Sequence, residues 1–115
     1  ESRFIEQIMV VGPNRKFVAA LIVPSFINVR HKFKEDGIEL PESNEALIKN
    51  EQVIALIQEQ VDKQNEHLSH VEQVKKFVLL PEEWTVENGI LTPKLSLRRK
   101  KVDERYQQEI ESLYV

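Results

Sequence analysis

Two apolar runs rich in β-branched residues open the chain, at residues 4–11 and 16–23. Between them lies the segment Gly-Pro-Asn-Arg at residues 12–15, which is typical of the turn in a β-hairpin. The second run is apolar from its second position onward, so we expect a central strand that is covered on both faces. A third run, residues 74–80, stops at Pro81 and predicts a third strand.

Helical patterns fill the stretch between the second and third runs. Ser25 is placed to begin a helix that reaches about Glu35, and Ser43 is placed to cap a short helix through Ile48. A longer helix is expected over roughly residues 50–67. Its apolar positions recur on one face, which predicts packing against the sheet: Val53, Ile54, Leu56, Ile57 and Val61.

The C-terminal third consists of a long loop and a last helix. Residues 81–97 show little regular pattern, and a loop of that length in a compact domain is usually functional or mobile. We expect its Trp84 to fill the core of this domain, the alternative being a contact with another domain. The helix is predicted from Arg98 to Tyr114, with one apolar face: Val102, Tyr106, Ile110, Leu113 and Tyr114.

These elements predict an α+β fold. We expect a small antiparallel sheet, built from the N-terminal hairpin and the third strand and packed with helices. A helical insertion occupies the middle of the chain, and a helix closes its C-terminal end.

Composition narrows the class of protein. The chain has 115 residues, enough for one domain, and it contains no cysteine, which excludes disulfides and thiolate metal sites. No apolar run approaches the ~20 residues that cross a bilayer. The net charge of −3 argues against a general nucleic-acid binder. Because the chain starts with Glu1 rather than methionine, we expect its N-terminus to have been cut or not to be the native one.

Basic residues gather at the end of the long loop. Lys94 follows Thr92 and Pro93, and a lysine on a proline-stiffened loop can place a positive charge near a phosphate or carboxylate oxygen. The alternative is an ordinary solvated lysine. The cluster that follows has three readings, namely a solvated helix start, a site for a phosphate-bearing ligand, or a nucleic-acid or lipid contact: Arg98, Arg99, Lys100 and Lys101.

Other motifs with chemical meaning are weak. His67 and His70 could share a helix face, but two histidines without a clear third ligand are a poor metal signal, so no metal site is predicted. The chain has no HExxH and no GxSxG, and its glycines are too scattered for a phosphate-binding loop.

The motif Glu-Asn-Gly-Ile-Leu-Thr-Pro at residues 87–93, preceded by Trp84, resembles a run in the long-chain fatty acyl-CoA synthetases, which are AMP-forming ligases. Further matches to that family are Leu95, Leu97, Arg99, Lys100 and Val102. The N-terminal hairpin, residues 5–24, is similar to the opening of the C-terminal domain of these enzymes, and residues 25–70 resemble the helical insertion of the long-chain subgroup. The resemblance therefore identifies the whole chain, residues 1–115, as such a mobile C-terminal domain.

The resemblance implies a reaction in two halves. A fatty acid and ATP form an acyl-adenylate, and coenzyme A then gives acyl-CoA and AMP. ATP, Mg²⁺ and the fatty acid are expected to bind mainly on a large N-terminal domain, which is also the expected partner of this chain. The isolated chain is expected to be inactive. A cytoplasmic location follows, with peripheral membrane association of the full-length enzyme left open.

The site residues come from aligning the loop with the family pattern T-P-T-L-K-L. The family's catalytic lysine falls at Ser96, and Lys94 falls where the family has threonine. Two residues of extended chain span about 6.6 Å and keep the same side, so Lys94 could replace the missing lysine. We therefore expect Lys94 and Ser96 at the catalytic position, and Arg98, Arg99 and Lys100 at the coenzyme A site. Alternatively, Arg98 takes the place of the missing catalytic lysine, or adenylation proceeds without a loop lysine.

Two rivals to this reading remain. One is another adenylate-forming ligase that loads a carrier protein. The other is a non-enzymatic interaction module that binds an anionic partner through its basic helix start, with marked salt dependence.

Overall fold

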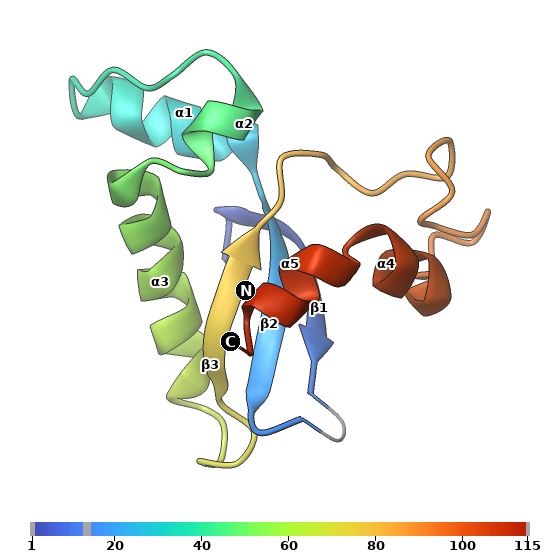
Figure 1. The fold of residues 1–115 in the computed structure, drawn as a ribbon. Coiled ribbons are helices and arrows are strands. Elements are labelled where there is room, and N and C mark those ends of the chain that lie inside the picture. Colours follow the sequence, from blue (N-terminus) through green and yellow to red (C-terminus); the bar gives the residue numbers. More distant parts are fainter. Residues whose placement is uncertain (1, 13–14, 115) are drawn as a thin grey trace.

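A three-stranded sheet forms the centre of the domain (Figure 1). The computed structural model describes residues 2–12 and 15–114, so Pro13 and Asn14 of the predicted turn lie outside the described residues. Strand β1 (Ile5–Val11) pairs antiparallel with β2 (Val18–Pro24), which confirms the predicted hairpin. Strand β3 (Val74–Leu79) pairs with the other edge of β2, so β2 is central, as predicted.

The direction of β3 differs from the prediction. We expected an antiparallel sheet, but β3 runs parallel to β2, and the sheet is therefore mixed. The reason lies in the connection between them, because parallel strands need a long crossover, usually helical. The helical insertion between β2 and β3 is that crossover. The α+β class, the insertion and the C-terminal helical segment are confirmed.

Three helices form the crossover. Helix α1 (Phe26–Glu35) and helix α2 (Asn44–Leu47) precede α3 (Glu51–Asn65). The hydroxyl of Ser43 accepts a hydrogen bond from the amide of Ala46 and caps α2 as predicted, whereas the Ser25 side chain makes no capping bond to α1.

The C-terminal helix is interrupted. It forms α4 (Arg99–Arg105) and α5 (Gln107–Ser112), separated at Tyr106, whose φ of −111° and ψ of 25° leave the helical region. Its predicted apolar face is correct, because Val102, Tyr106, Ile110 and Leu113 are buried and Tyr114 packs against them.

The sheet separates two apolar cores. On one face, α1 and α3 cover β2 and β3, and this core includes Ala20 and Ile22 of β2. On the other face, α4, α5 and the loop after β3 pack against Leu21 and Val23 of β2. Because β2 contributes to both cores, its uninterrupted apolar sequence is explained.

Two buried polar atoms in the second core have no hydrogen-bond partner among the described residues. They are the indole nitrogen of Trp84 and the hydroxyl of Tyr106. Burial raises the pKa of Tyr106, and the nearby Trp84 side chain partly offsets that rise, although the indole nitrogen and the hydroxyl do not meet the distance and angle of a hydrogen bond. Tyr114 differs, because its hydroxyl lies 3.0 Å from the carbonyl oxygen of Phe17. The two tyrosines therefore form a natural matched pair.

We expect Tyr106→Phe to leave the free energy of unfolding unchanged or to raise it by up to about 1 kcal/mol, because it removes a buried hydroxyl without a partner. The matched variant Tyr114→Phe removes a hydroxyl that is hydrogen-bonded and should lower stability by about 1 kcal/mol. Urea denaturation of both variants measures the difference. A larger loss for Tyr106→Phe than for Tyr114→Phe would contradict the assignment.

Burial of Tyr106 also predicts an effect of pH on stability. Burial holds the pKa of Tyr106 above its ordinary value of 10.0, so the unfolded chain loses this proton at lower pH than the folded chain does. The contribution of this group to stability is therefore complete below pH ~10 and declines as the pH rises through the folded pKa. Tyr106→Phe should flatten that alkaline decline.

Candidate functional site

The loop between β3 and α4 is anchored at Trp84. The Gln7 side chain on β1 donates a hydrogen bond to the Trp84 carbonyl oxygen at 2.9 Å and accepts one from its amide at 2.7 Å. The Trp84 side chain is only 2% exposed and belongs to the core beneath α4 and α5. This confirms the prediction that it fills the domain's own core.

Asn88 organises the next part of the loop. Its side-chain oxygen accepts hydrogen bonds from the amides of Thr85 and Ile90, and its nitrogen donates to the Glu83 carbonyl oxygen and to the Glu82 carboxylate. Gly89 follows with φ +82°, a conformation that glycine adopts without strain. The Asn-Gly pair therefore has a local structural reason, because it folds the chain that leads to Thr92.

A tight turn presents the candidate catalytic residues. The Thr92 carbonyl oxygen accepts a hydrogen bond from the Leu95 amide at 2.7 Å, and the Thr92 amide donates to the Ser96 carbonyl oxygen at 2.9 Å. Leu91 and Leu97 pair as an antiparallel bridge that closes the turn. This is the pattern of a three-residue hairpin loop, with residues 93–95 at its tip.

Leu95 has an unusual backbone. Its φ is +64°, in the left-handed region that favours glycine or asparagine, and its side chain is 69% exposed. The chain therefore turns between Lys94 and Ser96. Our assumption that these two residues are two steps along an extended strand, with side chains on the same side, is wrong. The assignment of Lys94 and Ser96 to the catalytic position stays a prediction.

Both predicted catalytic residues lie at the surface. Lys94 and Ser96 are exposed, and the loop that carries them projects away from the sheet, beyond α4 in Figure 1. Among the described residues, no side-chain hydrogen bond or salt bridge involves the Lys94 ammonium. The geometry therefore leaves this charge available to a group outside the domain.

The predicted phosphate-binding cluster is divided. Arg98 donates to the Gly89 carbonyl oxygen at 3.4 Å, and Arg99 donates to the Val10 carbonyl oxygen at 2.9 Å, on the outer edge of β1. Lys100 is exposed and makes no side-chain hydrogen bond within the described part of the chain. Two of the three predicted residues therefore donate hydrogen bonds to backbone carbonyl oxygens, whereas the Lys100 side chain makes none within the described residues.

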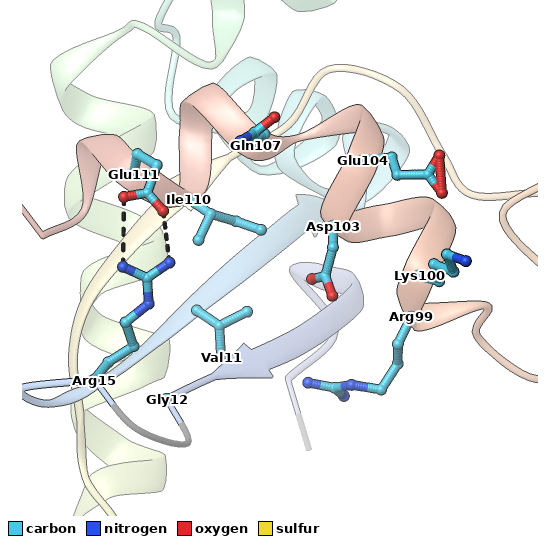
Figure 2. A pocket seen from close by; sticks show the side chains of 10 residues that line it. All are labelled: Val11, Gly12, Arg15, Arg99, Lys100, Asp103, Glu104, Gln107, Ile110 and Glu111. Atoms are coloured by element: carbon cyan, nitrogen blue, oxygen red, sulfur yellow. Dashed lines mark hydrogen bonds and ion pairs between the residues drawn. The ribbon is translucent and has the colours of Figure 1, made fainter.

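Arg99 and Lys100 line a groove between the end of β1 and the helices α4 and α5 (Figure 2). Arg15 lies at its other end, where it forms a two-pronged ion pair with Glu111, 2.6 Å at its shorter contact. Asp103 and Glu104 also face the groove, so the formal charges of its three cations and three acids cancel. The groove is polar and open, but it is not a concentrated positive site.

Sequence reasoning did not predict the ion pair between Arg15 and Glu111. The Glu111 side chain raises the pKa of Arg15 by hydrogen bonding, and the Arg15 hydrogen bond lowers the pKa of Glu111. The two residues are 96 positions apart in the sequence, and only the packing of α5 on the sheet brings them together.

Comparison with known proteins decides the family. A family model described as the AMP-binding enzyme C-terminal domain matches residues 1–115. The chain belongs to this family.

The relatives of this AMP-binding C-terminal domain are acyl-activating ligases. Long-chain-fatty-acid–CoA ligase 5 of Mus musculus is 34% identical, over 98% of this chain and 17% of its own length. A long-chain-fatty-acid–CoA ligase of Mycobacterium tuberculosis is 32% identical, over 96% of this chain and 18% of its own. A long-chain-fatty-acid–[acyl-carrier-protein] ligase of Arabidopsis thaliana is 31% identical, over 98% of this chain and 14% of its own length. The chain thus spans less than a fifth of these relatives.

Among solved structures, the A-PCP didomain of a carboxylic acid reductase from Segniliparus rugosus, in complex with AMP, is similar to this chain. The TM-score is 0.71 and the identity 27%, over 98% of this chain and 14% of the reductase chain. The likeness places the fold of this AMP-binding C-terminal domain among adenylation domains.

The described residues of this AMP-binding C-terminal domain contain no group of three or more His, Cys, Asp or Glu side chains that could hold a metal ion. His67 and His70 thus do not belong to such a group. Within residues 2–12 and 15–114, no helix is both long and apolar enough to span a bilayer.

Proposed function

We propose that this domain belongs to a long-chain-fatty-acid–CoA ligase that works through an acyl-adenylate. In the first half-reaction a fatty-acid carboxylate oxygen attacks the α-phosphorus of ATP and pyrophosphate leaves. In the second, the coenzyme A thiol loses its proton and attacks the acyl carbonyl carbon, and AMP leaves. The names of the relatives from mouse and Mycobacterium tuberculosis support this reaction. The observation that carries the proposal is the exposed turn with Lys94 at its tip.

Lys94 is the proposed adenylation residue. Negative charge shifts onto pyrophosphate and the α-phosphate oxygens as the acyl-adenylate forms, and a positioned cation stabilises that charge. The Thr92–Ser96 hydrogen bonds fix the backbone on either side of Lys94, so that its ammonium is carried on a preformed turn. Ser96, at the position where the family has lysine, supplies no charge, and we propose that it only stabilises the turn through its backbone hydrogen bond to Thr92.

The rest of the active site is proposed to lie on the large N-terminal domain of the parent enzyme, the full-length protein that would contain this chain. That domain is proposed to bind ATP, the fatty acid and Mg²⁺, as the resemblance to the long-chain fatty acyl-CoA synthetases implies. This chain alone is expected to form no acyl-CoA. A cytoplasmic location and peripheral membrane association of the parent stay predictions.

Coenzyme A is proposed to meet the domain near the start of α4. Of the three residues expected there, Lys100 has the freest charge, whereas Arg98 and Arg99 hold the carbonyl oxygens of Gly89 and Val10. Lys100 is therefore the residue best placed to meet a phosphate group of the ligand.

A second candidate function is acyl transfer to a carrier protein. Two comparisons favour it, since the Arabidopsis relative is named as an acyl-carrier-protein ligase and the Segniliparus structure joins an adenylation domain to a PCP domain. The chemistry of the first half-reaction is the same, and only the thiol acceptor differs.

An acceptor competition distinguishes the two functions. The parent enzyme is given a long-chain fatty acid, ATP and Mg²⁺ with either coenzyme A or a phosphopantetheinyl carrier protein, and thioester formation is measured. We expect a rate with coenzyme A at least about tenfold above that with the carrier. The reverse preference would replace the proposed function with the carrier-loading one, and no acyl-adenylate with any fatty acid would reject both.

A further inference from the structure

The outer edge of β3 is an open strand edge, and β3 forms one side of the sheet (Figure 1). The Leu80 amide donates to the Ile22 carbonyl oxygen of β2 at 2.8 Å. Every second residue of a parallel strand bonds to the same neighbour, so Val78 also faces β2, whereas Phe77 and Leu79 direct their amides and carbonyl oxygens outward. Among the described residues, these outward groups have no hydrogen-bond partner.

Other parts of the sheet edge are protected from pairing. On β1, Arg99 donates to the outward-facing carbonyl oxygen of Val10 at 2.9 Å. At the start of β3, the Asn65 side chain donates to the Val74 carbonyl oxygen at 3.0 Å and accepts from the Val74 amide at 2.9 Å. Charged side chains and covering segments are ordinary ways of keeping an edge from binding another strand. Within the described part of the chain, the second half of β3 has neither.

An apolar groove runs along this open half of β3. Ile48, after α2, and Ile54, in the first turns of α3, line it on one face of the sheet. Val78 and Leu80 line it from the other face. An added strand uses outward backbone groups for affinity and flanking apolar contacts for its alternate side chains. The chemistry of this edge therefore fits an extended segment with apolar side chains.

Charge is divided between the two ends of β3. Lys75 and Lys76 lie at its start and are exposed. At its other end the groove is lined by Glu45 and Glu109, together with Lys49. Neither of these two carboxylates forms a hydrogen bond or salt bridge with another described residue. Opposite charges at opposite ends suit a partner strand that runs antiparallel, because its start then lies beside the end of β3.

We propose that the partner is β3 of a second copy of this domain, which joins two three-stranded sheets into one sheet of six strands. With Val78 facing Val78 of the second copy, Phe77 of each copy lies opposite Leu79 of the other, and their outward backbone groups pair. The contact has two-fold symmetry and uses the same surface on both copies. Because each β3 then has a neighbour on both sides, assembly through this edge stops at the dimer.

The proposed register brings Lys76 close to Glu109 of the second copy. Lys76 lies on the α5 face of the sheet, where its ammonium is 5.7 Å from the ring of Phe17. In the antiparallel pairing it lies opposite Leu80 of the second copy, and Leu80 lines the groove together with Glu109. Two such contacts form in each dimer, one on either side of the two-fold axis.

Disulfide formation in the parent enzyme tests the register. This chain has no cysteine, so Val78→Cys and Val71→Cys can be compared in a parent whose other cysteines are replaced by serine. Facing residues that do not bond to each other's backbone have Cα atoms about 4.5 Å apart, which a disulfide can span. We expect Val78→Cys to form linked dimers at least about tenfold faster than Val71→Cys. Val71 is 82% exposed, so random collisions would favour position 71, and equal or slower linkage at position 78 would overturn the proposal.

A charge exchange supplies the second readout and leaves the core untouched. Sedimentation of the parent enzyme is expected to show a dimer that dissociates on dilution. Glu109→Lys should weaken this dimer about tenfold, because it replaces two attractive contacts with repulsive ones, and adding Lys76→Glu should restore it. The matched control Glu104→Lys, in the groove beside β1, should leave the dimer unchanged.

A parent enzyme that is monomeric at high micromolar concentration would overturn the inference. So would a dimer that Glu109→Lys leaves intact, or one that Lys76→Glu does not restore, because another surface would then hold it together. Neither readout needs catalysis, so failure here is separable from failure of the proposed ligase function.

Discussion

Lys94→Ala in the parent enzyme is expected to lower fatty-acid-dependent ATP–pyrophosphate exchange by about 10²–10³-fold. That is the usual cost of removing one preorganised group that stabilises charge in a transition state. The reason is structural, because the Lys94 ammonium makes no side-chain hydrogen bond or salt bridge within the described residues and its backbone is held by the Thr92–Leu95 and Thr92–Ser96 hydrogen bonds. The coenzyme A half-reaction, measured from preformed acyl-adenylate, should be unchanged.

Three control variants sharpen this test. Ser96→Ala should exchange normally, because the turn uses the Ser96 backbone rather than its hydroxyl. Lys101→Ala removes an exposed lysine outside the predicted site and should also be normal. Lys94→Arg keeps the charge but changes its shape, so partial activity is expected. Normal exchange by Lys94→Ala would show that the loop has no adenylation role, and the site assignment would fail while the family stands.

The hydrophobic pattern was sufficient to predict most of the fold. The uninterrupted apolar run in β2 predicted a strand buried on both faces, and the period of Val53, Ile57 and Val61 predicted the buried face of α3. The direction of a strand could not be predicted in the same way. It depends on the end of the sheet to which the crossover returns the chain, and the apolar pattern of the strand itself does not show which end that is. This is why β3 was expected to be antiparallel.

The candidate site was less predictable for two reasons. Leu95 occupies a left-handed position that usually requires glycine or asparagine, so nothing in its side chain signals the turn. The pair formed by Arg15 and Glu111 depends on packing between distant segments. By contrast, the Glu-Asn-Gly motif was visible as a motif, and the structure adds its physical reason in the hydrogen bonds of Asn88.

Trp84→Ala is expected to give the largest loss of stability. Truncating a buried aromatic residue typically costs about 3–5 kcal/mol, against a total of about 5–15 kcal/mol for a domain. Trp84 lies in the core beneath α4 and α5, and Gln7 holds both of its backbone groups. With a urea dependence of about 2 kcal/mol per M, the unfolding midpoint should fall by roughly 2 M.

Trp84→Phe separates the apolar contribution from the polar one. Phenylalanine retains much of the buried area and removes an indole nitrogen that has no hydrogen-bond partner among the described residues, so it should cost less than half as much as alanine. Equal losses for the two variants would mean that this nitrogen makes a stabilising contact. In the parent enzyme Trp84→Ala should also lower pyrophosphate exchange, because the loop that carries Lys94 begins at this anchor.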